Sequence, residues 1–216
     1  MIKNITEIPL DGGSACLDFI NSGYNDELDV ITERWLSYKD LLVLVKRLKL
    51  MPIKKIQRLE KLSIEKPRLA VNALRKAIEI RSHMHTIFIH LANSRMIKIG
   101  GTALKSFNNE MFNALSKQTL IADNNLLLPG WNNDVDDLDD PLFYFLKSAH
   151  DILVHKNQKR IKQCGGCAWL FLDETKNNTR KWCKMQSCGC RQKAKRYYRR
   201  KLAGKTQLQS KAKKKI

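Results

Sequence analysis

CGGCAWLFLDETKNNTRKWCKMQSCGCR, residues 164–191, contains five of the six cysteines in this 216-residue chain. Four of them have the spacing Cys164-x2-Cys167-x15-Cys183-x4-Cys188. Two close pairs of thiolates separated in this way are typical of a tetrahedral structural zinc site, because a two-residue gap aims both sulfurs at one ion. We therefore predict one Zn²⁺ per chain, held by these four cysteines.

Two alternatives to this ligand set remain open. One is a disulfide framework, which is disfavoured because Met1–Asn4 leads into no secretory signal, so that we expect a reducing, cytoplasmic location. The other is that Cys190 replaces Cys188 as the fourth ligand. Cys188 is favoured because Gly189 beside it lets the chain turn close to the metal. Cys16 lies far from the cluster in an apolar run and is expected in the core.

Positive charge is concentrated at the C-terminal end of the chain. The net charge is +19, and residues 156–216 contribute +18 of it, with 20 Lys and Arg against 2 Asp and Glu. Such a segment favours a polyanionic partner, most commonly nucleic acid. We divide the chain into a nearly neutral domain at 1–157, a zinc module at 158–204 and a basic disordered tail at 205–216.

The first domain is predicted to be mainly α-helical. Apolar residues at three- and four-residue spacing predict helices from Tyr38, Ile53, Pro67 and Leu104, and one that begins at Asp140-Pro141. Ser37 and Asp40 have the spacing of a capping box. No run of apolar residues is long enough to cross a membrane.

Short β-hairpins and an acidic loop complete this domain. We expect hairpins at residues 5–22, with Asp11-Gly12-Gly13 as the turn, and at residues 119–131, with Asp123-Asn124-Asn125 as the turn. The acidic run at residues 134–140 lacks the Gly and closing Glu of a calcium-binding EF-hand loop and predicts a solvated loop.

Within the zinc module, we expect a β-hairpin whose first strand is residues 168–173 and whose second arm is residues 180–183. A basic helix should follow from Cys188-Gly189 to about Leu202, with Ala194, Tyr198 and Leu202 on its buried face. The cations expected to contact nucleic acid are Arg180, Arg191, Lys193, Lys195, Arg196, Arg199 and Arg200. Arg191, Lys195 and Arg199 lie on one face of this helix. Arg191 could instead have a structural role and form hydrogen bonds within the zinc module.

These residues resemble the CGNR zinc-finger family. The family pattern joins a Cys-x2-Cys pair, a Trp-x-Phe-x-Asp run, Asn and Arg in the loop, Trp-Cys-x-Met, and Cys-Gly-Asn-Arg before a Lys/Arg-rich helix with Tyr. The matching positions here are Cys164, Cys167, Trp169, Phe171, Asp173, Thr175, Asn177, Arg180, Trp182, Cys183, Met185, Cys188, Gly189, Arg191, Lys193, Lys195, Arg196 and Tyr198. The Asn of the family name is Cys190 in this chain, which offers a fifth thiolate.

The N-terminal domain resembles the mainly α-helical ABATE domain in Gly12-Gly13, in residues 16–22 and in residues 38–42. Together, the two resemblances imply a bacterial, stress-linked transcription regulator with a ligand-sensing N-terminal domain. We accordingly expect a DNA-binding protein, with RNA binding or a protein-interaction module as alternatives. An enzyme is not expected, since no nucleophile elbow, phosphate-binding loop or pair of catalytic carboxylates is recognisable.

Overall fold

The computed structural model describes residues 4–25, 30–31, 33–93, 101–131 and 135–213; for 24–25, 30–31 and 202–213 it describes the backbone only. The described helices are α1 (Ala15–Asn21), α2 (Tyr38–Arg47), α3 (Ile53–Glu65), α4 (Pro67–Asn93), α5 (Gly101–Ser116), α6 (Asp140–His155) and α7 (Cys190–Lys213). Three antiparallel two-stranded sheets accompany them: β1 (Tyr24–Asn25) with β2 (Val30–Ile31), β3 (Gln118–Asp123) with β4 (Leu126–Trp131), and β5 (Ile161–Gln163) with β6 (Leu170–Leu172). The predicted fold class, mainly α with small hairpins and a zinc module, is confirmed.

Local sequence signals place the helices of the first domain. The capping box of Ser37 and Asp40 starts α2, Pro67 is the first residue of α4, and α6 has Pro141 in its first turn. The hairpin predicted at residues 119–131 is present as β3 and β4. Its two turn residues, Asn124 and Asn125, both have positive φ.

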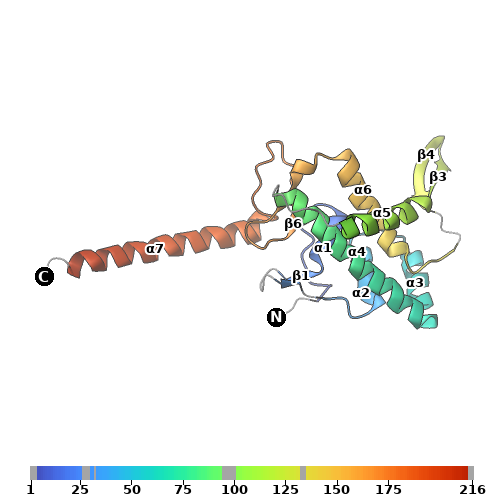
Figure 1. Cartoon of the computed structure of the whole chain (residues 1–216), viewed down its shortest axis with the longest axis horizontal. Coiled ribbons are helices and arrows are strands. Elements are labelled where there is room, and N and C mark those ends of the chain that lie inside the picture. The colour runs from blue at the N-terminus through green and yellow to red at the C-terminus, as the bar shows by residue number, and fades with distance from the viewer. Residues whose placement is uncertain (1–3, 26–29, 32, 94–100, 132–134, 214–216) are drawn as a thin grey trace.

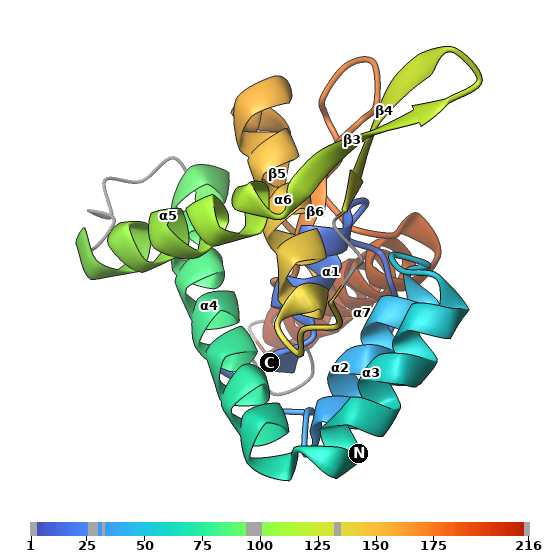
Figure 2. The ribbon, with the colours of Figure 1, turned by 90° about the vertical axis from the view of Figure 1, so that its right-hand side faces the viewer.

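Helix α1 lies at the centre of the molecule. In Figure 2 it stands between α4 on one side and the pair of α2 and α3 on the other. Residues 16–21 are all buried, and Phe19 stacks on Phe145 of α6 with ring centroids 4.3 Å apart. Because α1 is buried all round, it lacks the one-sided apolar pattern that marks a surface helix.

The hairpin predicted at residues 5–22 is therefore wrong, since Ala15–Asn21 is helical. Gly12 and Gly13 form the loop before this helix instead of a hairpin turn. The Gly12 N–H donates to the buried carboxylate of Asp18 at 2.9 Å, and a Cβ at Gly12 would lie only 2.9 Å from Asp18 Oδ1. The Gly12 carbonyl accepts from the N–H of Leu172 in β6 at 2.9 Å.

The acidic segment before α6 is tied to the neighbouring helices rather than solvated as predicted. Its carboxylates pair with cations of α3 and α4 at 2.7–2.8 Å; the pairs are Asp136 with Arg58, Asp139 with Lys76, and the buried Asp140 with Lys55. Separating Lys55 from Asp140 would leave buried charges without a partner, which costs free energy. This pair therefore fixes the start of α6 against α3.

Helix α7 differs from the others because it leaves the molecule and stands alone (Figure 1). It runs to Lys213, past the end predicted near Leu202 and over residues 205–213 of the segment expected to be a disordered tail; residues 214–216 of that segment lie outside the described residues. The buried face predicted for it is wrong where side chains are described: Ala194 is exposed, and the side chain of Tyr198 is 63% exposed. No helix in the described part of the chain is both long and apolar enough to span a bilayer.

Candidate metal centre

The first pair of cysteines lies in the turn of the β5–β6 hairpin. Strand β5 leads into Cys164, and β6 follows Cys167 after Trp169. Two backbone hydrogen bonds close the turn, from the Cys164 N–H to the Trp169 carbonyl at 2.8 Å and from the Ala168 N–H to the Cys164 carbonyl at 2.9 Å. The partner of β6 is therefore β5, and not the return at residues 180–183 that the sequence predicted.

The second pair is brought to this turn from the other side. The Gly165 N–H donates to the Lys181 carbonyl at 3.0 Å, which sets Cys183 beside the turn. Cys188 follows in a π-helical turn, Met185–Gly189, just before α7. A Cβ on Gly189 would lie 2.4 Å from Met185 Sδ, so glycine at this position lets the Met185 side chain pack against the turn.

The four sulfurs have the separations that a tetrahedral zinc site requires. All four cysteines are buried, and their Sγ atoms lie within 4.8 Å of one another. The Cys167–Cys183 and Cys183–Cys188 sulfur distances are 3.6 and 3.7 Å. A tetrahedron with Zn–S bonds of about 2.3 Å has sulfurs about 3.8 Å apart. The cluster therefore fits one Zn²⁺, and Cys190, which is exposed, lies outside it.

Contacts among the cysteines shift the pKa values of the thiols in opposite directions. Hydrogen bonds from Cys167 and Cys183 lower the pKa of Cys164, and the N–H groups of Cys183 and Gly166 add to this effect. The same contact with Cys164 raises the pKa of Cys167 and Cys183. These contacts favour ionisation of Cys164 over that of Cys167 and Cys183. A divalent cation allows all four sulfurs to ionise, so binding releases protons.

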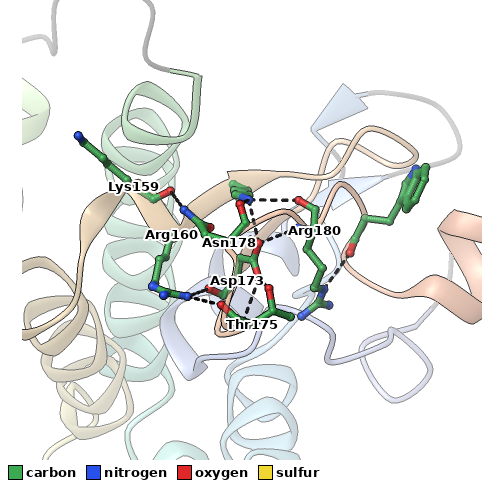
Figure 3. A network of polar contacts seen from close by, with 8 residues as sticks. Lys159, Arg160, Asp173, Thr175, Asn178 and Arg180 are labelled. Carbon is green, nitrogen blue, oxygen red and sulfur yellow. Dashed lines mark hydrogen bonds and ion pairs between the residues drawn. The ribbon is translucent and has the colours of Figure 1, made fainter.

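Asp173 organises the loop between the two cysteine pairs (Figure 3). Its fully buried carboxylate accepts hydrogen bonds from Lys162 Nζ and from the N–H of Arg180, both at 2.8 Å, and from the N–H and hydroxyl of Thr175. Burial opposes ionisation, but these donors hold the pKa of Asp173 below its usual range. Arg160 closes the loop by donating to the carbonyls of Asp173 and Thr175.

Arg180, expected at a nucleic-acid interface, is used inside the finger. Its Nε donates to the carbonyl of Trp182 at 3.2 Å, and its Nη2 donates to the carbonyl of the ligand Cys183. The guanidinium also lies 4.9 Å from the centre of the Phe171 ring. Arg180 therefore helps to hold Cys183, the first cysteine of the second pair, in place.

Arg191 also contacts the metal centre. Its Nη2 donates to Cys188 Sγ at 3.5 Å, although the residue is exposed. A Zn²⁺ ion with four thiolates carries a net charge of −2, which a neighbouring guanidinium offsets. The bracing role that the sequence left open for Arg191 is thus the one its described contact supports.

The other cations predicted to bind nucleic acid lie along α7. All of them are exposed: Lys193, Lys195, Arg196, Arg199 and Arg200. Residues 190–213 contain no Asp or Glu. Tyr197 and Tyr198 are also exposed, with their rings 5.7 Å apart. Trp169, in contrast, is buried and cannot stack on a base.

A basic groove lies between the end of α4 and the finger. Its volume is about 950 Å³, and its described lining includes Lys159, Lys162, Arg180 and Lys181 but no Asp or Glu. A second hollow of about 520 Å³ shares Arg180 and Lys181 with it. Positive charge therefore extends from the loop of the finger toward α7.

Asn21 of α1 is the structural residue that sequence reasoning missed. Its Nδ2 donates to the Leu170 carbonyl and its Oδ1 accepts from the Leu170 N–H, both at 2.9 Å. The amide thus occupies the edge of β6 that β5 leaves open. In the sequence, Asn21 is a polar residue directly after a mostly apolar run. This pattern could have marked it as a buried polar residue, but the tertiary structure is needed to show its partner.

Another group of metal-ligand types lies near the end of α6, where His150, Asp151 and His155 approach one another. Asp151 is already paired with Lys147 Nζ at 2.5 Å, and His155 is exposed. The cysteine cluster is therefore the stronger metal centre.

Comparison with known proteins supports this description of the finger. Residues 160–201 match the family model described as the CGNR zinc finger. The match starts at Arg160 and ends in α7, so it covers the β5–β6 hairpin, the four cysteines and the root of the basic helix. A comparison with curated proteins found no relative. The resemblance of the N-terminal domain to the ABATE domain stays a prediction.

Proposed function

We propose that this protein is a DNA-binding transcriptional regulator that presents α7 to the phosphate backbone. One observation carries the proposal: the buried cysteine centre fixes the root of a helix whose described side chains after Gln192 are exposed. A zinc site is rigid, so it sets the direction of the helix that starts beside it. The cations of α7 are thereby held away from the neutral part of the chain.

The size of α7 suits a duplex. Its 24 residues extend for about 36 Å at 1.5 Å per residue, close to the length of one turn of DNA. An α-helix also fits the width of the major groove. Lys195 and Arg199 are four residues apart and lie on one face of α7, so that they can follow one strand of phosphates. The basic groove beside Lys181 offers a second place for the backbone.

The test compares two exposed arginines in the zinc-loaded protein. Arg199→Ala in α7 should weaken duplex binding and make the dependence of log affinity on log salt shallower by about one unit. Arg68→Ala in α4, also exposed, should leave both quantities unchanged. Equal effects of the two substitutions, or no binding to duplex DNA at low salt, would contradict the proposal.

RNA is the alternative that a specific observation favours, namely the exposed pair Tyr197 and Tyr198. Aromatic rings stack on unpaired bases, each stack contributing about 1–3 kcal/mol. Replacing both tyrosines with alanine should have little effect on duplex DNA binding if phosphate contacts dominate. A selective loss of affinity for single-stranded RNA would instead assign the helix to RNA.

Ligand sensing by the N-terminal domain stays a prediction. A pocket of about 340 Å³ lies among α3, α4 and the acidic segment before α6, lined in part by Leu62, Leu69 and Asp136. This volume is at the lower end for small-molecule sites. Thermal shift with metabolite pools, using the zinc-loaded full chain, would show whether any small molecule binds.

A further inference from the structure

The hairpin of β3 and β4 projects from the helical part of the molecule with both faces open (Figure 2). Five of its large aliphatic side chains are 44–67% exposed: Leu120, Ile121, Leu126, Leu127 and Leu128. Its base is anchored, because the ring of Trp131 packs on that of Tyr144 of α6 with centroids 4.8 Å apart. An isolated two-stranded hairpin is marginally stable in water, and additional strands stabilise it.

The two faces of the hairpin are not equally available. Ile121 folds over Gly130, where a Cβ would lie 2.1 Å from Ile121 Cδ1, and Ile121 is 48% exposed. On the other face Leu120 pairs with Pro129 and Ala122 with Leu127, and both leucines are 67% exposed. We call the surface of Leu120, Ala122, Leu127 and Pro129 the Leu120 face.

The two edges also differ. Asn124 and Asn125 have φ of 46° and 66°, as in a two-residue type I′ turn. The residues that flank such a turn exchange both hydrogen bonds, and hydrogen-bonded pairs alternate along the ladder. The outward backbone groups are therefore those of Leu120 and Ala122 on β3 and of Leu127 and Pro129 on β4. Proline has no N–H, so the β4 edge is interrupted while the β3 edge is open.

We propose that β3 pairs antiparallel with β3 of a second copy of this chain and joins the two hairpins into one four-stranded sheet. In the symmetric register Leu120 of one copy lies opposite Leu120 of the other, and Gln118 lies opposite Ala122. The Leu120 faces of both copies then form one apolar surface on the same side of the sheet. A two-fold contact of this kind uses the same patch on both chains and closes at the dimer.

The charge of the hairpin does not oppose a second copy at this place. The whole chain carries +19, which opposes self-association, but residues 118–131 contain one Asp and no Lys or Arg. Figure 1 shows that α7 leaves the molecule on the side away from the hairpin, so pairing through β3 keeps the two basic helices apart. The contact is independent of what α7 binds.

The size of the contact predicts a reversible dimer. Six residues of strand span about 20 Å. A contact of this length is smaller than the roughly 800 Å² per partner of a standard stable interface. The dimer should therefore dissociate on dilution and strengthen with salt, which screens the positive charges of the two chains.

The test uses sedimentation of the zinc-loaded full chain over a range of concentrations. Ala122→Pro removes an outward N–H from β3 without removing a hydrogen bond between β3 and β4, and it should abolish the dimer. Leu127→Pro is the matched control, because it removes an outward N–H from the opposite position on β4 and should leave the dimer intact. Both substitutions place a proline where no hydrogen bond between β3 and β4 is lost, so their effects on the stability of the hairpin should be similar.

Hydrogen exchange supplies a second measurement on the unmodified protein. The amides of Leu120 and Ala122 should exchange more slowly as the protein concentration rises, while the outward amide of Leu127 should not respond. A chain that stays monomeric at every concentration overturns the proposal. So does equal loss of the dimer in both proline variants, or assembly beyond two copies.

Discussion

At the scale of single residues, the buried carboxylate of Asp18 couples the stability of the fold to pH. Burial raises the pKa of Asp18 to about 7, with a smaller contribution from the charge of Asp11, against the opposing effects of the Gly12 N–H and Arg47. The folded state therefore binds a proton that the unfolded state releases near pH 4. This contribution to stability is complete below pH 4 and is lost as the pH rises through 7.

Asp18→Asn should remove that dependence. The Asn oxygen can still accept the hydrogen bond from the Gly12 N–H, so the loop keeps its contact with α1. At pH 8 the variant should be more stable than the wild type, by on the order of 3 kcal/mol. Urea unfolding of both proteins between pH 5 and 8 measures the difference. Parallel pH profiles for the two proteins would contradict the assignment.

Arg191 gives a second prediction at this scale. Because its Nη2 lies on Cys188 Sγ, Arg191→Ala should speed the loss of zinc to a chelator by roughly 10-fold or more, as for other residues that support metal ligands. Lys193→Ala, two residues along α7, is the control and should leave the zinc release rate unchanged. If both variants released zinc equally and only Arg191→Ala bound DNA more weakly, Arg191 would be assigned to phosphate contact with Lys195 and Arg199.

At the scale of elements, the sequence predicted those helices and strands whose formation depends on local residue patterns. Helices α2 to α6 followed from amphipathic spacing and caps, and the β3–β4 hairpin from its turn residues. Helix α1 was missed because its burial on all sides removes the periodicity, and Gly12-Gly13 resembles a hairpin turn. The cysteine spacing predicted the metal centre but not the pairing of β5 with β6, since a metal fixes sulfurs and not strand partners.

The contact of α1 with β6 is the element-scale interaction that we expect to matter most for stability. Asn21→Ala leaves the buried N–H and carbonyl of Leu170 without the partners seen here. The free energy of unfolding should fall by about 2–6 kcal/mol, because each of the two unsatisfied buried polar groups costs about 1–3 kcal/mol. Asn21→Asp keeps an acceptor for the Leu170 N–H, but it loses the donor to the Leu170 carbonyl and adds a buried negative charge beside that carbonyl, so it should also destabilise the fold. Denaturant unfolding at fixed zinc should show a clear loss for Asn21→Ala.

At the scale of the whole molecule, the zinc module is built into the fold and is not simply attached to its end. Ile161, Leu170 and Phe171 are at most 1% exposed and belong to the same apolar core as α1 and α4. Lys184 adds an ion pair with Asp11 at 3.2 Å. The sequence suggested a boundary near residue 157 because charge changes there, but charge reports the surface and not the core.

Zinc removal should therefore destabilise the entire chain. A separate module would lose zinc and unfold while the N-terminal helices kept their melting temperature. With β5 and β6 in the shared core, chelation or Cys164→Ser should instead lower the temperature of the main unfolding transition, because metal binding supplies folding free energy to everything that folds with the site. Calorimetry with and without chelator measures this, with Cys190→Ser as the control that keeps all four ligands. An unchanged main transition in the zinc-free protein would show that the core does not depend on the finger.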